Sequence, residues 1–359
     1  MRKISIRPPK AKFHRLECLR GAAALYVLLH HISSSYLHLQ KTIIGTFFRF
    51  GQEAVVVFFV LSGFVIAYSM ERAEGSDWRG YFLKRLRRIY PIFLFSLLLA
   101  WLFPVQESTF RNPSLPWWLA GNVLMLQDVA SKPGVWVEPF FGNSPLWSLS
   151  YEWLYYMLFF PIRRFVRAEN RKWVVLALSV GGILMNRVWP NPFGNILALF
   201  PVWWTGVEFA SSFLKRGKVI PREVVTQALV LVVPLLMFAG LVWMEVKMGN
   251  HPSMIVYPLV QFRMLFDVLV LMAVFFLWQR IHFKGFDPLF RVFGLVAPIS
   301  YALYVFHYPL IGGLRLFSNE AWFWPDLICR VALVFVVSWI LERPVQKWIN
   351  ARTNRWITR

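Results

Sequence analysis

Arg20 and His31 are the residues whose types and spacing point most directly to chemistry, because both lie in an apolar stretch over residues 18–38. The eleven-residue spacing corresponds to about 16 Å along an α-helix and nearly a whole number of turns, so the two share a face. His30 would point about 100° away. An imidazole in such a stretch can act as a general base on a hydroxyl or as an acyl-accepting nucleophile. A hydrogen-bonded packing histidine is the alternative interpretation.

A second cluster, over residues 84–91, brings basic side chains to the start of another apolar stretch. Arg85 and Arg88 are three positions apart and therefore share a helix face. Paired guanidinium groups suit phosphates because each can donate two parallel hydrogen bonds. We expect a phosphate-bearing cytoplasmic ligand to dock here, with anchoring at the membrane surface as the alternative.

Residues 144–156 combine a carboxylate with aromatic rings. Glu152 at the start of a predicted helix could orient an imidazole or bind sugar hydroxyls. Trp147 and Tyr151 could stack on a sugar ring. The alternative is an aromatic belt at the membrane interface with a solvated carboxylate.

A tyrosine-rich segment follows near the C-terminus. Tyr301, Tyr304 and Tyr308 recur at helical spacing and form one polar-tipped face. His307 beside them could be a second functional imidazole, and a structural role is the alternative. Glu342 ends the last apolar stretch and could pair with basic residues at the inner membrane surface.

The composition requires these residues to be positioned by membrane helices. Of the 359 residues, 57% are hydrophobic and 16% are charged, whereas soluble domains have about a quarter charged residues. The net charge of +21 falls in short clusters between apolar stretches, which argues against a nucleic-acid partner. The two cysteines lack metal-site spacing, and we expect no metal.

A transmembrane helix needs about 20 apolar residues to cross a core of about 30 Å. Small residues near Gly51 and Gly63 indicate close helix packing. Residues 115–127 form a short apolar stretch bounded by proline and glycine, which predicts an interfacial or re-entrant segment. Ten stretches qualify as spans: 18–38, 53–71, 88–105, 145–164, 172–188, 196–213, 224–245, 258–280, 294–316 and 323–342.

The distribution of basic residues predicts the orientation. With the N-terminus inside, the inner segments hold 29 Lys and Arg residues and the outer segments hold eight. This asymmetry favours ten helices with both termini cytoplasmic, and it places His31 near mid-membrane with Arg20 toward the inner surface. We therefore expect an all-α polytopic protein of the inner or plasma membrane. Its expected parts are a basic N-terminal segment (1–15), a transmembrane domain (16–344) and a basic tail (345–359).

Taken together, these residues resemble the membrane-bound acyltransferase-3 family, which includes O-antigen and exopolysaccharide O-acetyltransferases. Each matching piece is short, but their order within a ten-helix frame is specific. The pieces are Leu19–Ala23 with His30 and His31, Gly51 with Phe58–Phe64, Arg85–Pro91, Trp147–Glu152, Ile299–Tyr304 with His307, and Glu342–Pro344.

The resemblance assigns candidate roles. The family's basic-x10-His motif matches Arg20 and His31, and so selects His31 over His30 as the catalytic histidine. The resemblance implies acetyl-CoA as the acyl donor. Many members carry a second acidic residue where this chain has Trp153. If that second carboxylate helps to bind the acceptor in the family, this chain lacks the residue for that role. The implied residues are His31 and Glu152 for catalysis, Arg20, Arg85 and Arg88 for the donor, and Trp147, Tyr151, Tyr301, Tyr304 and His307 for a glycan or lipid-linked sugar acceptor.

A transporter or flippase is the runner-up, because an intramembrane His and Arg could also form a proton or anion path. The sequence lacks the internal repeat and paired broken helices of many transporters. A non-enzymatic scaffold would have no need of the Arg20 and His31 stripe.

Overall fold

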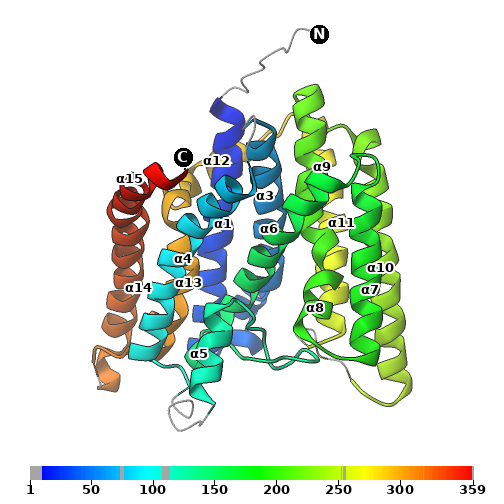
Figure 1. The fold of residues 1–359 in the computed structure, drawn as a ribbon. Coiled ribbons are helices and arrows are strands. Elements are labelled where there is room, and N and C mark those ends of the chain that lie inside the picture. The colour runs from blue at the N-terminus through cyan, green and yellow to red at the C-terminus, as the bar shows by residue number, and fades with distance from the viewer. Residues whose placement is uncertain are drawn as a thin grey trace. The chain divides into compact units, whose positions relative to one another are not determined.

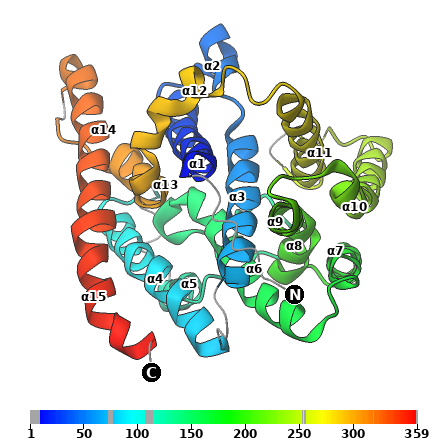
Figure 2. The same cartoon turned by 90° about the horizontal axis from the view of Figure 1, so that it is seen from above.

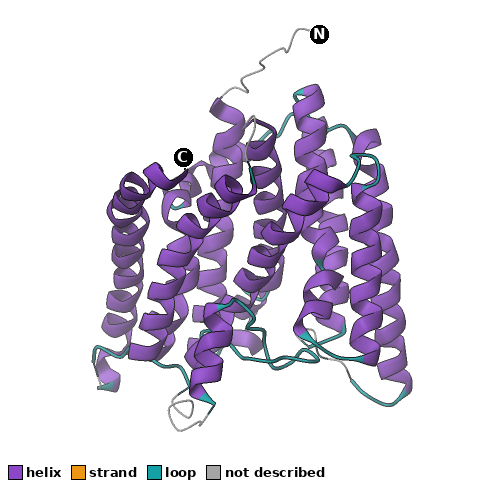
Figure 3. Ribbon diagram, in the orientation of Figure 1, coloured by secondary structure: helices purple, strands orange, loops and turns teal. Residues whose placement is uncertain are grey.

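The computed structural model describes residues 10–72, 77–106, 114–251, 253, 256–317 and 319–357. These residues form helices joined by loops (Figure 3), and one isolated β-bridge pairs Gln127 with Val137. The prediction of an all-α protein is confirmed. Most of the predicted basic segment 1–15 lies outside the described residues.

Each predicted span coincides with one helix or with consecutive helices (Figure 1). Helical segments of three to five residues connect several of them. The α-helices are α1 (Lys10–His31), α2 (Ile43–Phe47), α3 (Gly51–Arg72), α4 (Trp78–Leu102), α5 (Leu115–Val123), α6 (Trp147–Phe165), α7 (Arg171–Val188), α8 (Pro192–Ala198), α9 (Phe200–Arg216), α10 (Pro221–Lys247), α11 (Leu259–Arg280), α12 (Phe286–Phe290), α13 (Ser300–Tyr308), α14 (Phe323–Ile340) and α15 (Gln346–Ile357).

Several helices are long and apolar enough to cross a membrane. Five segments of the described chain meet this criterion, and a sixth does so if a pair of helices bent by 40° counts as one span. The protein is therefore a multi-pass membrane protein. The five are Ile43–Arg72, Pro192–Arg216, Pro221–Lys247, Leu259–Arg280 and Phe323–Asn354, and the bent pair is Phe286–Leu295 with Ala297–Gly313.

The short apolar stretch 115–127 contains α5, which has nine residues. At about 1.5 Å per residue, such a helix covers less than half of a hydrocarbon core of about 30 Å. This confirms that the stretch is not a span.

The chain divides into two compact units, and each is described separately. Unit 1 comprises Met1–Ala22, Val55–Glu74 and Pro161–Ala297. Unit 2 comprises Ala23–Ala54, Gly75–Phe160 and Pro298–Arg359. In unit 1, α7, α9, α10 and α11 pack together, and in unit 2, α13 contacts both α4 and α14 (Figure 2).

Unit 1 contains a close approach of two helix backbones. A Cβ added at Gly206 in α9 would lie 2.0 Å from the Val60 carbonyl oxygen in α3, and one added at Gly63 would lie 2.2 Å from the Trp203 carbonyl oxygen. Only glycine permits this separation. The indole of Trp203 also donates a hydrogen bond of 3.2 Å to the Ser62 hydroxyl. The predicted packing role of the small residues in this helix is confirmed.

Unit 2 contains the three π turns of the described chain, at Ile32–Tyr36, Pro309–Gly313 and Leu341–Val345. The first follows His31 directly, so His31 is the last α-helical residue of α1. The second follows Tyr308. Single π turns are rare and occur frequently at functional sites.

Candidate active site

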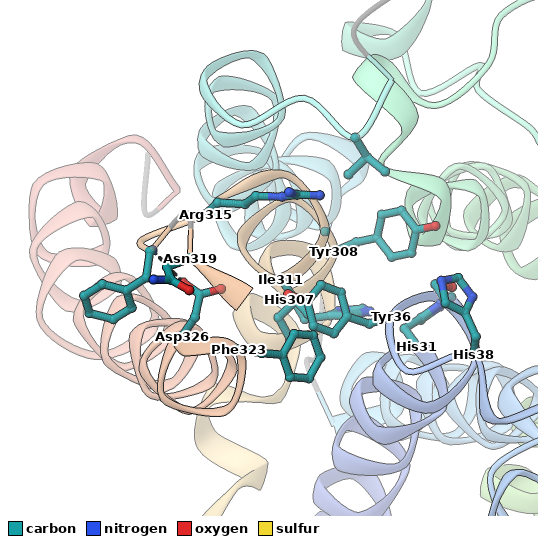
Figure 4. Close-up of a pocket in the computed structure, with 14 residues that line it drawn as sticks. His31, Tyr36, His38, His307, Tyr308, Ile311, Arg315, Asn319, Phe323 and Asp326 are labelled. Atoms are coloured by element: carbon teal, nitrogen blue, oxygen red, sulfur yellow. Dashed lines mark hydrogen bonds between the residues drawn. The ribbon is translucent and has the colours of Figure 1, made fainter. Parts of the chain in front are cut away.

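A cavity of about 420 Å³ opens in unit 2 beside His31 (Figure 4). Its walls come from the end of α1 and the first π turn, from His307 and Tyr308 of α13, and from the segment that leads into α14. Clefts of about 300–1,000 Å³ are typical for small ligands. The volume therefore suits a small-molecule site.

Two imidazoles meet at this cavity. The ring centroids of His31 and His307 lie 5.1 Å apart, and the Tyr308 ring packs edge-on against His31 at 5.0 Å. His307 is fully buried, and its Nδ1 lies 3.2 Å from the Leu303 carbonyl oxygen. That contact places the proton on Nδ1 and leaves Nε2 as an acceptor.

Each imidazole keeps a ring nitrogen uncommitted. His31 Nδ1 and His307 Nε2 are buried, and neither finds a hydrogen-bond partner among the described residues. Buried polar atoms are nearly always paired in folded proteins, so unpaired ones call for an explanation. Two such atoms beside a cavity indicate a place where a hydroxyl group can bind.

His30 has a different environment from His31. Its Nδ1 lies 2.6 Å from the Phe48 carbonyl oxygen, and its ring packs so tightly on Gly51 that a Cβ there would come within 2.5 Å of it. His30 therefore fastens the end of α1 to the start of α3. This supports His31 as the chemically available histidine and explains the glycine at position 51.

Arg20 is fixed within unit 1. It donates a hydrogen bond of 3.1 Å from Nη2 to the Ala297 carbonyl oxygen. The next residue, Gly21, contacts the same region, because an added Cβ would lie 2.0 Å from the Phe293 carbonyl oxygen. The Arg20–Gly21 pair thus holds α1 against the segment that precedes α13.

The two arginines of α4 have different surroundings. Arg85 is 8% exposed, its Cζ lies 3.8 Å from the centroid of the Tyr81 ring, and it donates to the Tyr81 carbonyl oxygen. Arg88 has a side chain that is 46% exposed and forms an ion pair with Glu342. Glu342 also accepts a hydrogen bond of 2.9 Å from the Ala302 backbone N–H. Glu342 thus pairs with a basic residue, as predicted, and the partner is Arg88 of α4.

Trp147 and Tyr151 are buried, at 6% and 0% exposed. The Tyr151 hydroxyl donates to Asp128 Oδ2 at 2.7 Å, and Lys132 Nζ lies 2.7 Å from Asp128 Oδ1 and 3.8 Å from the Trp147 ring centroid. Burial lowers the pKa of Lys132, and the Asp128 carboxylate opposes that shift. In this structure neither aromatic ring offers an exposed face for a sugar. Both instead fasten the loop after α5 to α6.

Of the predicted site residues, only His31 and His307 line the cavity, and the remaining ones lie outside it. Glu152 accepts a hydrogen bond from Tyr156, one turn further along α6. Tyr301 donates to the Ile89 carbonyl oxygen at 3.0 Å. The Tyr304 hydroxyl lies 2.7 Å from that of Ser148. The Tyr301 and Tyr304 contacts hold α13 against α4 and α6.

The sequence did not predict the role of Arg330, which holds the backbone on the side of the cavity next to α14. Arg330 in α14 is fully buried and donates from Nη1 to the Ile311 and Leu314 carbonyl oxygens at 2.5 and 2.8 Å. It also pairs with Asp326 at 2.6 Å, and its Cζ lies 4.5 Å from the centroid of the Tyr36 ring. The available signal was an acid and a base four positions apart in an apolar stretch, which is costly in lipid unless they pair.

Comparison with known proteins identifies the family of this chain. A family model described as an acyltransferase domain matches residues 13–343. This match covers most of the chain. The chain belongs to the acyltransferase-3 family, as the sequence motifs predict.

Two curated relatives have partial similarity. Over 169 residues the chain is 33% identical to acyltransferase MdmB of Streptomyces mycarofaciens, covering 45% of this chain and 42% of the relative. Over 102 residues it is 35% identical to protein 2 in the picA locus of Rhizobium radiobacter, covering 25% of this chain and 45% of the relative. The chain thus spans less than half the length of both. No solved structure matches.

Proposed function

We propose that this acyltransferase moves an acetyl or other short acyl group from cytoplasmic acyl-CoA to a hydroxyl of an extracytoplasmic or lipid-linked glycan. The observation that carries the proposal is the His31 imidazole, which has a buried nitrogen without a partner at a cavity of small-molecule size. Membership of the acyltransferase family supplies the reaction class. The glycan acceptor follows from the resemblance of the motifs to O-acetyltransferases.

The imidazole of His31 supports two forms of the transfer. As a general base it removes the proton of the acceptor hydroxyl while that oxygen attacks the thioester carbonyl. The carbon–sulfur bond then breaks, and the CoA sulfur leaves with the proton. As a nucleophile, His31 first takes the acyl group itself and passes it to the hydroxyl in a second step. Both forms yield the same ester and free CoA.

The proposed donor site uses basic residues of α1 and α4. Arg88 is the strongest candidate for the donor phosphates, because its side chain is 46% exposed while Glu342 holds it in place. Arg85 is buried on Tyr81 and would act by fixing this turn of α4. Arg20 lies in unit 1, and its proposed part in donor binding rests on the motif alone.

The proposed topology has ten membrane spans with both termini in the cytoplasm, in the inner or plasma membrane. It is supported by the excess of basic residues in the inner segments and by a helix at each of the ten predicted stretches. Figure 1 shows α5 at one end of unit 2 and α15 at the other. With α15 on the cytoplasmic side, the cavity at the start of α14 would face outward, toward a glycan.

The test is transfer by the purified protein in lipid nanodiscs with ¹⁴C-acetyl-CoA, together with mass spectrometry of cell-surface glycans from cells that carry or lack the gene. We expect His31→Ala and His31→Gln to abolish transfer while the protein remains folded. His30→Gln is the matched variant and should keep most of the activity, because His30 makes a packing contact. Full transfer by His31→Gln would overturn the assignment.

A further inference from the structure

The cavity beside His31 is lined by one cationic side chain, Arg315, and by one carboxylate that is already engaged. Asp326 is the carboxylate among the lining residues, and both of its oxygens are already engaged. Oδ1 accepts hydrogen bonds from the Leu316 and Phe317 backbone N–H groups at 2.8 and 3.1 Å, and Oδ2 pairs with Arg330 at 2.6 Å. Asp326 therefore contributes little negative potential to the cavity.

Arg315 supplies the remaining charge. It lines the cavity, it is exposed, and it has no ion-pair partner among the described residues. Figure 4 shows its side chain extending from the segment after the second π turn toward Tyr308. Its backbone is held in place, because Arg330 binds the Leu314 carbonyl oxygen immediately before it and Asp326 binds the Leu316 N–H immediately after it.

The surroundings increase the effect of this charge. Tyr36 and Phe323 stack with ring centroids 5.5 Å apart and form an apolar wall of the cavity, and Ile311 adds an aliphatic surface. Apolar walls reduce screening by water and focus the potential of a charge within a cleft. A planar guanidinium also matches the two oxygens of a carboxylate or phosphate.

We propose that Arg315 binds an anionic group of the acceptor, so that the glycan acylated at His31 carries a carboxylate or phosphate close to the reacting hydroxyl. This inference rests on the proposed function, because it places the acceptor in the cavity beside His31. The proposed acceptor is a sugar with an anionic oxygen group. This group could be the carboxylate of a uronic acid or the phosphate of a sugar phosphate.

Direct binding tests this without an acyl donor. The full chain in nanodiscs is titrated with methyl β-glucuronide, with glucose 1-phosphate and with neutral methyl β-glucoside, and binding is followed by saturation-transfer NMR. We expect at least one of the two anionic sugars to bind about tenfold more tightly than the neutral glucoside. This difference in affinity should disappear in Arg315→Gln. The tighter of the two anionic probes identifies carboxylate or phosphate as the natural group.

Two matched variants complete the experiment. Arg49→Gln removes another exposed arginine of unit 2 outside the cavity lining and should leave anion binding unchanged. Arg315→Lys keeps the charge without the paired donors and should retain part of the preference, which separates a charge effect from misfolding. Equal binding of all three probes by the unmodified protein would overturn the anion site, as would an unchanged preference in Arg315→Gln.

The result also separates this inference from the proposed function. Arg315-dependent anion binding without acyl transfer to any sugar would leave the anion site standing and remove the proposed reaction. Equal acyl transfer to neutral and anionic sugars, unaffected by Arg315→Gln, would leave the reaction standing and remove the anion site.

Discussion

The two compact units differ in the kind of side chain that they bury. Among the described residues, every buried Asp, Glu, Lys, Arg or His side chain lies in unit 2, whereas the buried polar side chains of unit 1 carry amide and hydroxyl groups. These residues of unit 2 are Arg85, Asp128, Lys132, His307, Asp326, Arg330 and Glu342.

This contrast shows two ways to fix helices within a membrane. Lipid is as apolar as leucine, so burial of apolar surface does not by itself drive helices together. Unit 1 uses close backbone contact at Gly63 and Gly206. Unit 2 uses ion pairs and charged hydrogen bonds, and one of these pairs, Asp326 with Arg330, supports the wall of the cavity. We therefore expect unit 2 to be sensitive to loss of charge and unit 1 to added volume.

The largest expected effect is at the buried pair of Asp128 and Lys132. Asp128→Asn keeps the shape of the side chain but leaves the Lys132 ammonium buried without its counter-ion. Breaking a buried pair in this way costs about 3–5 kcal/mol of folding free energy. Thermal unfolding in detergent, followed by circular dichroism, measures the loss.

A double variant provides the control for this prediction. Asp128→Asn combined with Lys132→Met removes both charges and should recover much of the stability, because the uncompensated cation is gone. Equal stability of Asp128→Asn and the unmodified protein would show that unit 2 does not depend on this pair.

The second prediction concerns unit 1. Gly206→Ala places a methyl group 2.0 Å from the Val60 carbonyl oxygen, so α3 and α9 must separate. Overpacking typically costs about 1–3 kcal/mol, and a clash with backbone belongs at the upper end of that range. The same unfolding measurement applies.

Gly240→Ala in α10 is the matched substitution, because nothing lies within 4 Å of an added Cβ there. It should leave stability unchanged or raise it by up to about 1 kcal/mol, since alanine is the better helix former. Similar losses for the two glycines would mean that close backbone contact does not hold unit 1 together.

The smallest expected effect is at the ion pair between the partly exposed Arg88 and the buried Glu342. Glu342→Gln retains a carbonyl oxygen for the Ala302 N–H but removes the negative charge. We expect a loss of about 1–2 kcal/mol, because solvent screens Arg88. A double-mutant cycle with Arg88→Gln isolates the pair. A coupling energy near zero would restrict the importance of charge in unit 2 to ion pairs whose two partners are both buried.

Local patterns in the sequence predicted much of this molecule. Apolar length located the helices, the spacing of Arg20 and His31 put both on α1, and the small residues near Gly63 indicated close packing. These features depend on neighbours along one helix. The motif also separated His31 from His30, and the contacts of His30 agree with that choice.

Features that depend on distant segments were less accessible. Nothing in the local sequence shows that Tyr151 meets Lys132, so its ring was expected to face a ligand. The pairing of His31 with His307 and the support of the Arg315 segment by Arg330 also join residues far apart in the chain. Such contacts follow from how the helices pack, and hydropathy carries no information about them.

The π turns have a consequence for how relatives of this chain can be compared. Each accommodates one residue more than an α-helical turn, and one residue corresponds to about 100° about a helix axis, so the side chains within the turn lie at other angles than in a regular α-helix. Two of them separate His31 and Tyr308 from later residues of the cavity wall. A relative with a one-residue gap at either turn could keep every motif and still direct a different set of side chains toward its substrate.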